Sequence, residues 1–361
     1  MSNQVIQKRG RLERFAEAIR SGRITLGFIG GSITEAHRPS NWPYFITSWL
    51  LQRYPGLRIR WENAAIGGTG SLSGGFRCED DLLSENCDIV FFEYAVNDGP
   101  GTETFRTREG LLRMLLAAGL DVVMVHTYCQ DHYKAMSADE MPQGIVELEQ
   151  LAEHYNVSSV WVGLHAYNEL KAGRMTWEAW LPEGLHPEYM GSSVYAEAVI
   201  RFLSDELADP AVKPILRGDA MPEPIDPKCF QKYVEVPFDD IEFLGPWHIQ
   251  RVVKHSFFRH VLVTAADGAS IRFRFKGRAL TMMQSFGKTS GVFQCSIDGG
   301  EPVEILGDRS WWVPDAEWAR PFLLADDLKP GEHTCTFTVR HGNREECKGT
   351  NCRILSIKSV L

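Results

Sequence analysis

The chain has 361 residues, 44% hydrophobic and 24% charged, which is the balance of an ordinary globular protein with room for two domains. Its formal charge of −9 argues against nucleic-acid binding, which usually needs a basic face, and against attraction to anionic membranes. No stretch is apolar for long enough to span a bilayer, so we expect neither a nucleic-acid partner nor a membrane partner.

The N-terminal segment predicts a helix rather than a targeting signal. Residues 1–20 are polar and lack the apolar core of a signal peptide. Leu12, Phe15, Ala16 and Ile19 recur at helical spacing, which predicts an amphipathic helix. The eight cysteines are scattered without the spacing of a disulfide framework, and reduced thiols are expected in the cytosol. Together these features favour a cytoplasmic protein.

Residues 24–207 alternate between short apolar runs and amphipathic helical patterns. The apolar runs predict five strands, at 24–30, 57–63, 88–96, 121–128 and 157–164. Helical stripes lie between them, at 42–50, 108–118 and 138–155, and a last helix runs to about residue 207. Strands that alternate with helices predict an α/β domain, a five-stranded parallel sheet with helices on both faces, over residues 1–208.

The pattern changes after Asp209. Five prolines interrupt residues 209–228 and no periodicity is present, which predicts a linker. Beyond it, residues 271–275 and 335–339 alternate between apolar and polar, and Asp298-Gly299-Gly300 offers hairpin-turn chemistry. Short strands with turn signals and no helices predict an antiparallel β-sandwich over residues 229–361.

Chemically capable residues follow the predicted strands of the α/β domain, where parallel sheets carry their sites. Gly30-Gly31-Ser32 comes directly after the first strand, and glycines there permit a sharp turn with an exposed hydroxyl. A dinucleotide-binding glycine loop, with Glu62 as its acidic residue, and a plain tight turn are the alternatives. Gly67-Gly68 and Asn97 follow the next two strands, and each could by itself be only a turn.

A histidine loop precedes the last helix. His186 has a carboxylate, Glu183, three residues before it, and this pair could form the base and the orienting acid of a catalytic triad. A lone histidine beside Pro187 is otherwise an ordinary loop residue. His126, Cys129 and His132 could suggest metal ligands, but their spacing across a strand end favours ordinary loop residues or walls of a substrate pocket.

The order Ser, Gly, Asn, His, each at the end of its element, resembles the four blocks of the SGNH (GDSL-like) hydrolases. The resemblance covers about the first 207 residues and implies a flavodoxin-like three-layer fold. It implies Ser32 as nucleophile and His186 as base, with an oxyanion hole formed by the Ser32 and Gly68 N–H groups and the Asn97 amide. Gly67 is the alternative to Gly68. The family usually has Asp three residues before the histidine, and Glu183 departs from that pattern.

The resemblance implies a serine esterase that needs no cofactor and no metal. The two-part layout is similar to bacterial carbohydrate acetyl esterases, whose sandwich resembles a carbohydrate-binding module. It implies acetylated oligosaccharides, such as mannan or xylan fragments, as substrate, with Trp311 and Trp312 stacking on sugar rings. Trp318 could stack in the same way, or all three could be packing residues. Another acyl hydrolase, a non-catalytic carbohydrate-binding protein and a homo-oligomer remain open.

Overall fold

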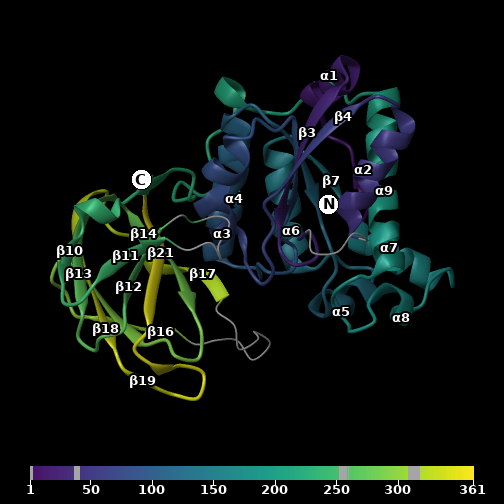
Figure 1. Cartoon of the computed structure of the whole chain (residues 1–361). Helices are drawn as coiled ribbons and strands as arrows, with labels where there is room; N and C mark the ends of the chain where they lie inside the picture. Colours follow the sequence, from purple (N-terminus) through teal and green to yellow (C-terminus); the bar gives the residue numbers. More distant parts are fainter. Residues whose placement is uncertain (1–2, 36–40, 252–257, 259, 308–317) are drawn as a thin grey trace. The chain divides into compact units, whose positions relative to one another are not determined.

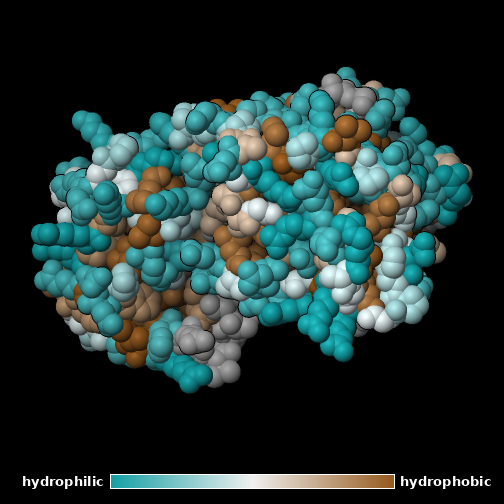
Figure 2. Space-filling model, turned by 90° about the horizontal axis from the view of Figure 1, so that it is seen from above, coloured by the Kyte–Doolittle hydropathy of each residue, from teal (hydrophilic) through white to brown (hydrophobic). Residues whose placement is uncertain are grey.

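The computed structural model describes residues 3–35, 41–251, 258, 260–307 and 318–361. It divides into two compact units, Met1–Gln231 and Lys232–Leu361 (Figure 1). Within the described residues, no helix has both the length and the apolar character needed to cross a membrane. On the face shown in Figure 2, hydrophilic side chains predominate and hydrophobic ones appear in separated groups.

The first unit is built on a six-stranded sheet. Its order is β1 (Ile6–Gln7), β7 (Ser158–Val160), β6 (Asp121–Val125), β5 (Ile89–Glu93), β3 (Arg23–Gly30) and β4 (Arg58–Asn63). The five strands from β7 to β4 are parallel, which confirms the predicted sheet, whereas β1 pairs with β7 in the antiparallel direction. A two-residue edge strand leaves no periodicity in the sequence, so β1 was not predicted.

Helices cover both faces of this sheet. The structure has α1 (Glu13–Ser21), α2 (Trp42–Arg53), α3 (Ser71–Cys78), α4 (Thr102–Ala117), α5 (Tyr133–Ser137), α6 (Gln143–His154), α7 (Val162–Lys171), α8 (Trp177–Trp180) and α9 (Tyr189–Ala208). Figure 1 shows α2, α7 and α9 on one side of the sheet and α3 and α4 on the other. The predicted three-layer α/β arrangement is therefore confirmed.

Local sequence explains where helix α2 begins and where helix α1 ends. Pro43 lies in the first turn of α2, where its missing N–H would have no partner in any case. Helix α1 ends at Gly22, whose φ of +76° is the left-handed conformation that glycine adopts without strain. Its N–H donates to carbonyls of the last turn, which closes the helix before β3 begins at Arg23.

The predicted strand at 157–164 is wrong in its second half. Strand β7 ends at Val160, and helix α7 begins at Val162. A short apolar run fits a buried strand and a buried helix equally well, so periodicity could not separate the two. The strands predicted at 88–96 and 121–128 also end early, at Glu93 and Val125, because the apolar residues that follow are buried in loops.

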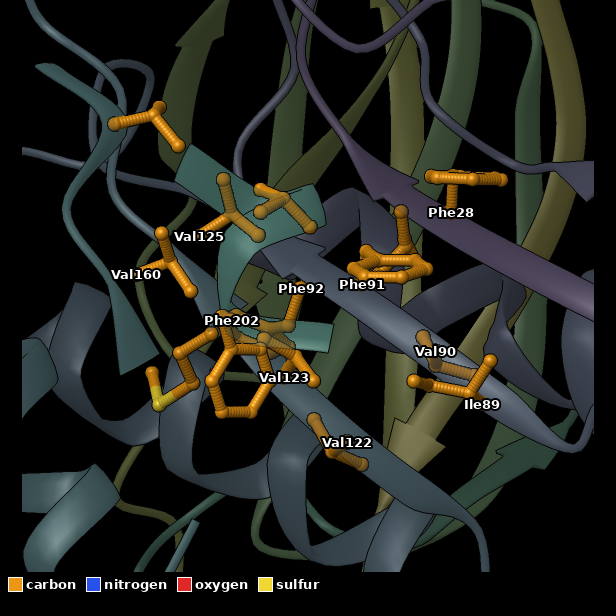
Figure 3. Packing of buried hydrophobic residues seen from close by; sticks show 14 of the residues in the cluster. Phe28, Ile89, Val90, Phe91, Phe92, Val122, Val123, Val125, Val160 and Phe202 are labelled. Carbon is orange, nitrogen blue, oxygen red and sulfur yellow. The ribbon is translucent and has the colours of Figure 1, made fainter. Parts of the chain in front are cut away.

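The core of the first unit explains the nearly continuous apolar run of β5. Its residues Ile89–Glu93 are all buried, as expected for a strand covered on both faces. Phe91 pairs in register with Phe28 of β3, and the two rings stack with centroids 5.0 Å apart (Figure 3). Trp42 of α2 packs edge-on against both rings, which fixes this helix on the sheet.

The segment predicted as a linker, 209–228, belongs to the first unit. Strand β8 (Lys213–Pro214) pairs with β2 (Gly10–Arg11), and Ile215 is buried in the core. The N–H groups of Ile225 and Asp226 donate to the Glu109 carboxylate on α4. Prolines remove periodicity but do not prevent such tertiary bonds, and the unit boundary lies after Gln231 instead.

In its described residues, the second unit contains two large antiparallel sheets, which confirms the predicted sandwich. One contains β10 (Glu242–Leu244), β13 (Ser270–Gly277), β18 (Gly331–Arg340), β15 (Val292–Ile297) and β16 (Val303–Leu306). The other contains β11 (His248–Arg251), β12 (His260–Thr264), β21 (Cys352–Val360), β14 (Ala279–Phe286) and β17 (Trp318–Ala325), with β9 (Tyr233–Glu235) beside β21. Strand β19 (Gly342–Asn343) pairs with β20 (Lys348–Gly349).

The alternation that predicted the sandwich is visible in its core. Ile271, Phe273 and Phe275 of β13 are buried, whereas the arginines between them are exposed. All eight cysteines are free thiols, and Cys295 and Cys335 approach to 3.7 Å between their sulfurs. Trp318 is half-buried at the start of β17, and Trp311 and Trp312 lie outside the described residues.

Candidate active site

The predicted serine and histidine meet at the carboxyl edge of the parallel sheet. Ser32 follows β3 directly, and its Oγ lies 2.7 Å from Nε2 of His186, a residue 154 positions later in the chain. His186 Nδ1 is hydrogen-bonded to Oε1 of Glu183. A hydroxyl, an imidazole and a carboxylate in sequence form the arrangement that activates a serine for nucleophilic attack.

The Glu183 side chain reaches the imidazole through a tight turn. Gly184 has a φ of +90°, a conformation that favours glycine, and Glu183 Oε1 also accepts the backbone N–H of His186 at 2.8 Å. The extra methylene relative to aspartate is thus accommodated within the turn. The Glu183 side chain is 56% exposed and that of His186 is 34% exposed. Water therefore competes with this hydrogen bond more than it would with a buried one.

The two positions before Ser32 require glycine because atoms of Glu93 and Asn97 lie where a Cβ would be. A Cβ on Gly30 would lie 2.8 Å from Oε2 of Glu93, and a Cβ on Gly31 would lie 1.8 Å from Oδ1 of Asn97. Neither glycine has a left-handed φ, so the sharp-turn argument from the sequence is not the reason for them. Gly31 thus lets the nucleophile loop lie directly against the Asn97 side chain.

The loop after β4 also lies against the nucleophile. A Cβ on Gly67 would be 3.3 Å from Cβ of Ser32 and 2.8 Å from Oε2 of Glu35. The Gly67 N–H already donates to Glu35 Oε2 at 3.1 Å. Gly68, with a φ of +70°, is the neighbouring backbone donor. Because the Gly67 N–H is already engaged, Gly68 remains the oxyanion donor that we predict.

Asp98 fixes the loop that carries Asn97. Its buried carboxylate accepts the Ser71 N–H at 3.0 and 3.1 Å, which caps the first turn of α3. Burial raises the pKa of Asp98 to about 6, against the opposing hydrogen bonds from Ser71. The sequence analysis did not single out Asp98, because the helix α3 that it caps was not predicted.

The histidines after β6 belong to a structural network. His126 is buried, and its Nε2 lies 2.8 Å from Oε1 of Glu149, whose other oxygen pairs with Arg9. Burial lowers the pKa of His132 to about 4. Over the part of the chain that the structure describes, no group of three His, Cys, Asp or Glu residues could hold a metal. Gln130 contacts the Gly184 region, so this loop borders the histidine loop.

Two carboxylates next to the nucleophile loop were missed in the sequence. Glu35 holds the Gly67 N–H, and Glu93 is buried at the end of β5, beside Gly30 and Gly31. A signal for Glu93 was present, because a charged residue that ends an apolar strand is rarely buried without a purpose. Glu35 gave no such signal, since its partner is a backbone group that only the fold brings near.

Comparison with known proteins extends the description of the fold. No protein-family model matches this chain, and neither does any curated protein. The crystal structure of a two-domain esterase (CEX) active on acetylated mannans, co-crystallized with mannopentaose, matches with a TM-score of 0.83 at 21% identity. The match covers 98% of this chain and 96% of that one. A second crystal structure of a two-domain esterase (CEX) active on acetylated mannans matches equally, over 98% and 97% of the chains. The chain therefore shares the whole two-domain fold.

Proposed function

We propose that the protein is a serine esterase that removes acetyl groups from carbohydrate through an acyl-serine intermediate. The observation that carries this proposal is the hydrogen-bonded series from Ser32 through His186 to Glu183 at the carboxyl edge of the sheet. The fold shared with an esterase active on acetylated mannans supports the choice of substrate class.

In the proposed reaction, His186 Nε2 accepts the Ser32 proton as Oγ attacks the acetyl carbonyl. The N–H groups of Ser32 and Gly68 and the Asn97 amide stabilise the oxyanion. His186 then returns the proton to the departing sugar hydroxyl. Water, deprotonated by the same histidine, attacks the acetyl-serine, the bond from the acyl carbon to Ser32 Oγ breaks, and Oγ takes the proton back from His186. The acetic acid that leaves ionises to acetate, so the cycle consumes only the acetyl ester and water.

A panel of p-nitrophenyl esters from acetate to palmitate tests the acyl specificity. We expect kcat/KM to be highest for acetate and to fall by about tenfold or more by butyrate, because a pocket shaped for a methyl group rejects added methylenes. Acetylated manno- and xylo-oligosaccharides should release acetate. A preference for long chains would indicate a lysophospholipase or thioesterase instead. No turnover of any ester would indicate a carbohydrate-binding protein.

The sandwich is proposed to bind the sugar through Trp311 and Trp312. Replacing either by alanine should leave p-nitrophenyl acetate hydrolysis intact and raise KM for acetylated oligosaccharides about fivefold, the effect of losing about 1 kcal/mol of stacking. Trp318→Ala is the matched control. Trp318 packs against Phe286 with ring centroids 5.6 Å apart, so this variant should lower the melting temperature. Equal losses on both substrates in the Trp311 and Trp312 variants would mean that these tryptophans are packing residues.

A further inference from the structure

Glu93 is a buried carboxylate at the centre of the candidate site. It is the last residue of β5 and is only 1% exposed. Its Oε2 accepts the Thr34 hydroxyl at 2.9 Å and the Gly31 N–H at 3.4 Å. Its Oε1 accepts the Thr127 hydroxyl at 2.7 Å. All three partners donate, which is the pattern that suits an ionised, acceptor-only carboxylate.

These bonds connect three loops that β3, β5 and β6 bring side by side, since the strands are neighbours in the sheet. Gly31 and Thr34 flank Ser32 on the nucleophile loop, and Glu93 itself precedes the segment that leads to Asn97. Thr127 lies on the loop whose Gln130 contacts Gly184, two residues before His186. One side chain at the start of the Asn97 segment is thus bonded to the nucleophile loop and to the loop that borders the histidine.

Burying a carboxylate is costly, and burial raises the pKa of Glu93 while its hydrogen bonds oppose that shift. The β5 strand is otherwise apolar at every buried position, so a leucine or methionine would fill this place without that cost. The carboxylate therefore needs an explanation other than packing.

We propose that Glu93 is a positioning residue, which holds the Gly31–Ser32 backbone and the Asn97 loop in the geometry that the oxyanion requires. The inference rests on the proposed role of Ser32. Glutamine at this place has nearly the same shape but presents an NH2 group to one side. If that group faced the Gly31 N–H, two donors would meet, because a backbone N–H cannot turn to accept. If it faced Thr127, the hydrogen bond would be reversed, and the Thr127 hydroxyl would have to accept instead of donate. The loops should then relax by a few tenths of an ångström or more.

The test compares Glu93→Gln with Glu206→Gln in the full-length protein. Glu206 is a matched control, since it is also a buried carboxylate that accepts backbone N–H groups, from Leu12 and Ala211, but it lies on α9 outside the site. We expect Glu93→Gln to lower kcat for p-nitrophenyl acetate about a hundredfold, with KM changed less than about threefold. Active sites are counted with a fluorophosphonate, which reacts with an activated serine whatever the natural ester is. Glu206→Gln should lower only the melting temperature.

Thr127 supplies a finer comparison. Thr127→Val removes the hydroxyl donor and should lower kcat about tenfold, whereas Thr127→Ser keeps the donor and should retain kcat. Amide hydrogen exchange of the peptide spanning residues 26–35 is a readout independent of any substrate. It should accelerate at least about tenfold in Glu93→Gln and remain unchanged in Glu206→Gln.

Unchanged kcat per active site together with unchanged exchange in Glu93→Gln would overturn the inference, as would equal effects in the two Glu→Gln variants. If the wild type labels with the fluorophosphonate but does not hydrolyse acetyl esters, the proposed substrate is rejected. Faster exchange of the 26–35 peptide in Glu93→Gln, with unchanged exchange in Glu206→Gln, would still support the inference about Glu93.

Discussion

Replacing Ser32 by alanine should lower kcat by at least about ten-thousandfold on p-nitrophenyl acetate and on acetylated oligosaccharides. The Ser32 hydroxyl has Nε2 of His186 at 2.7 Å, and no other hydroxyl is described at that nitrogen. The variant retains the oxyanion donors, so a small residual rate over water is expected. The melting temperature should change by no more than a few degrees, because the substitution removes one hydroxyl from a loop.

Two results would contradict the Ser32 assignment. One is retention of a large share of the wild-type kcat, and the other is loss of activity that parallels loss of folded protein. Circular dichroism and a thermal melt of the same preparation separate the second result from a true catalytic loss. Ser71→Ala is a suitable control, since Ser71 is buried nearby on α3 and its hydroxyl bonds Thr107 instead of the histidine.

Glu183→Gln should lower kcat about a thousandfold and change KM much less, because the amide no longer favours the imidazole tautomer that accepts the serine proton. A buried triad aspartate contributes about ten-thousandfold. The Glu183 side chain is 56% exposed, so we expect a smaller contribution here. Glu188→Gln is the control, as that residue lies two positions after His186 and makes no described contact with the imidazole.

The measurement is the steady-state kcat and KM of both variants with p-nitrophenyl acetate. A loss below about tenfold in Glu183→Gln would indicate either that Ser32 and His186 act as a dyad or that another group orients the imidazole. Glu183→Asp gives a further check. The turn at Gly184 places a glutamate side chain against the imidazole, and an aspartate side chain is one methylene shorter. This variant should therefore recover only part of the activity.

The sequence was most informative about the candidate site where its residues follow strands. In a parallel sheet the loops after neighbouring strands meet at one edge, so Ser32, Gly68 and Asn97 could be grouped without coordinates. His186 joined them by its place before a helix. The same reasoning could not find Glu35 or assign a role to Glu93, since their partners are backbone and hydroxyl groups on other loops, and only the folded chain brings these together.

The predictions for two segments of the fold differ from the structure, each for a local physical reason. The run at 157–164 is apolar because both β7 and α7 are buried, and a pattern of burial does not specify which backbone conformation achieves it. The proline-rich segment at 209–228 has no periodicity, yet Arg217 pairs with Asp121 and Ile215 enters the core. Tertiary contacts of this kind leave no periodic signal in the chain.

The most direct test of the proposed mechanism is to trap the acyl-enzyme. The protein is mixed with an acetylated manno-oligosaccharide, quenched in acid before the first turnovers are complete, and digested for peptide mass analysis. We expect the peptide that contains Ser32 to gain the mass of one acetyl group, to lose it with the rate of acetate release, and to show no gain in Ser32→Ala. Acetate release with no acetyl group on Ser32, or with the acetyl group on another residue, would contradict the account.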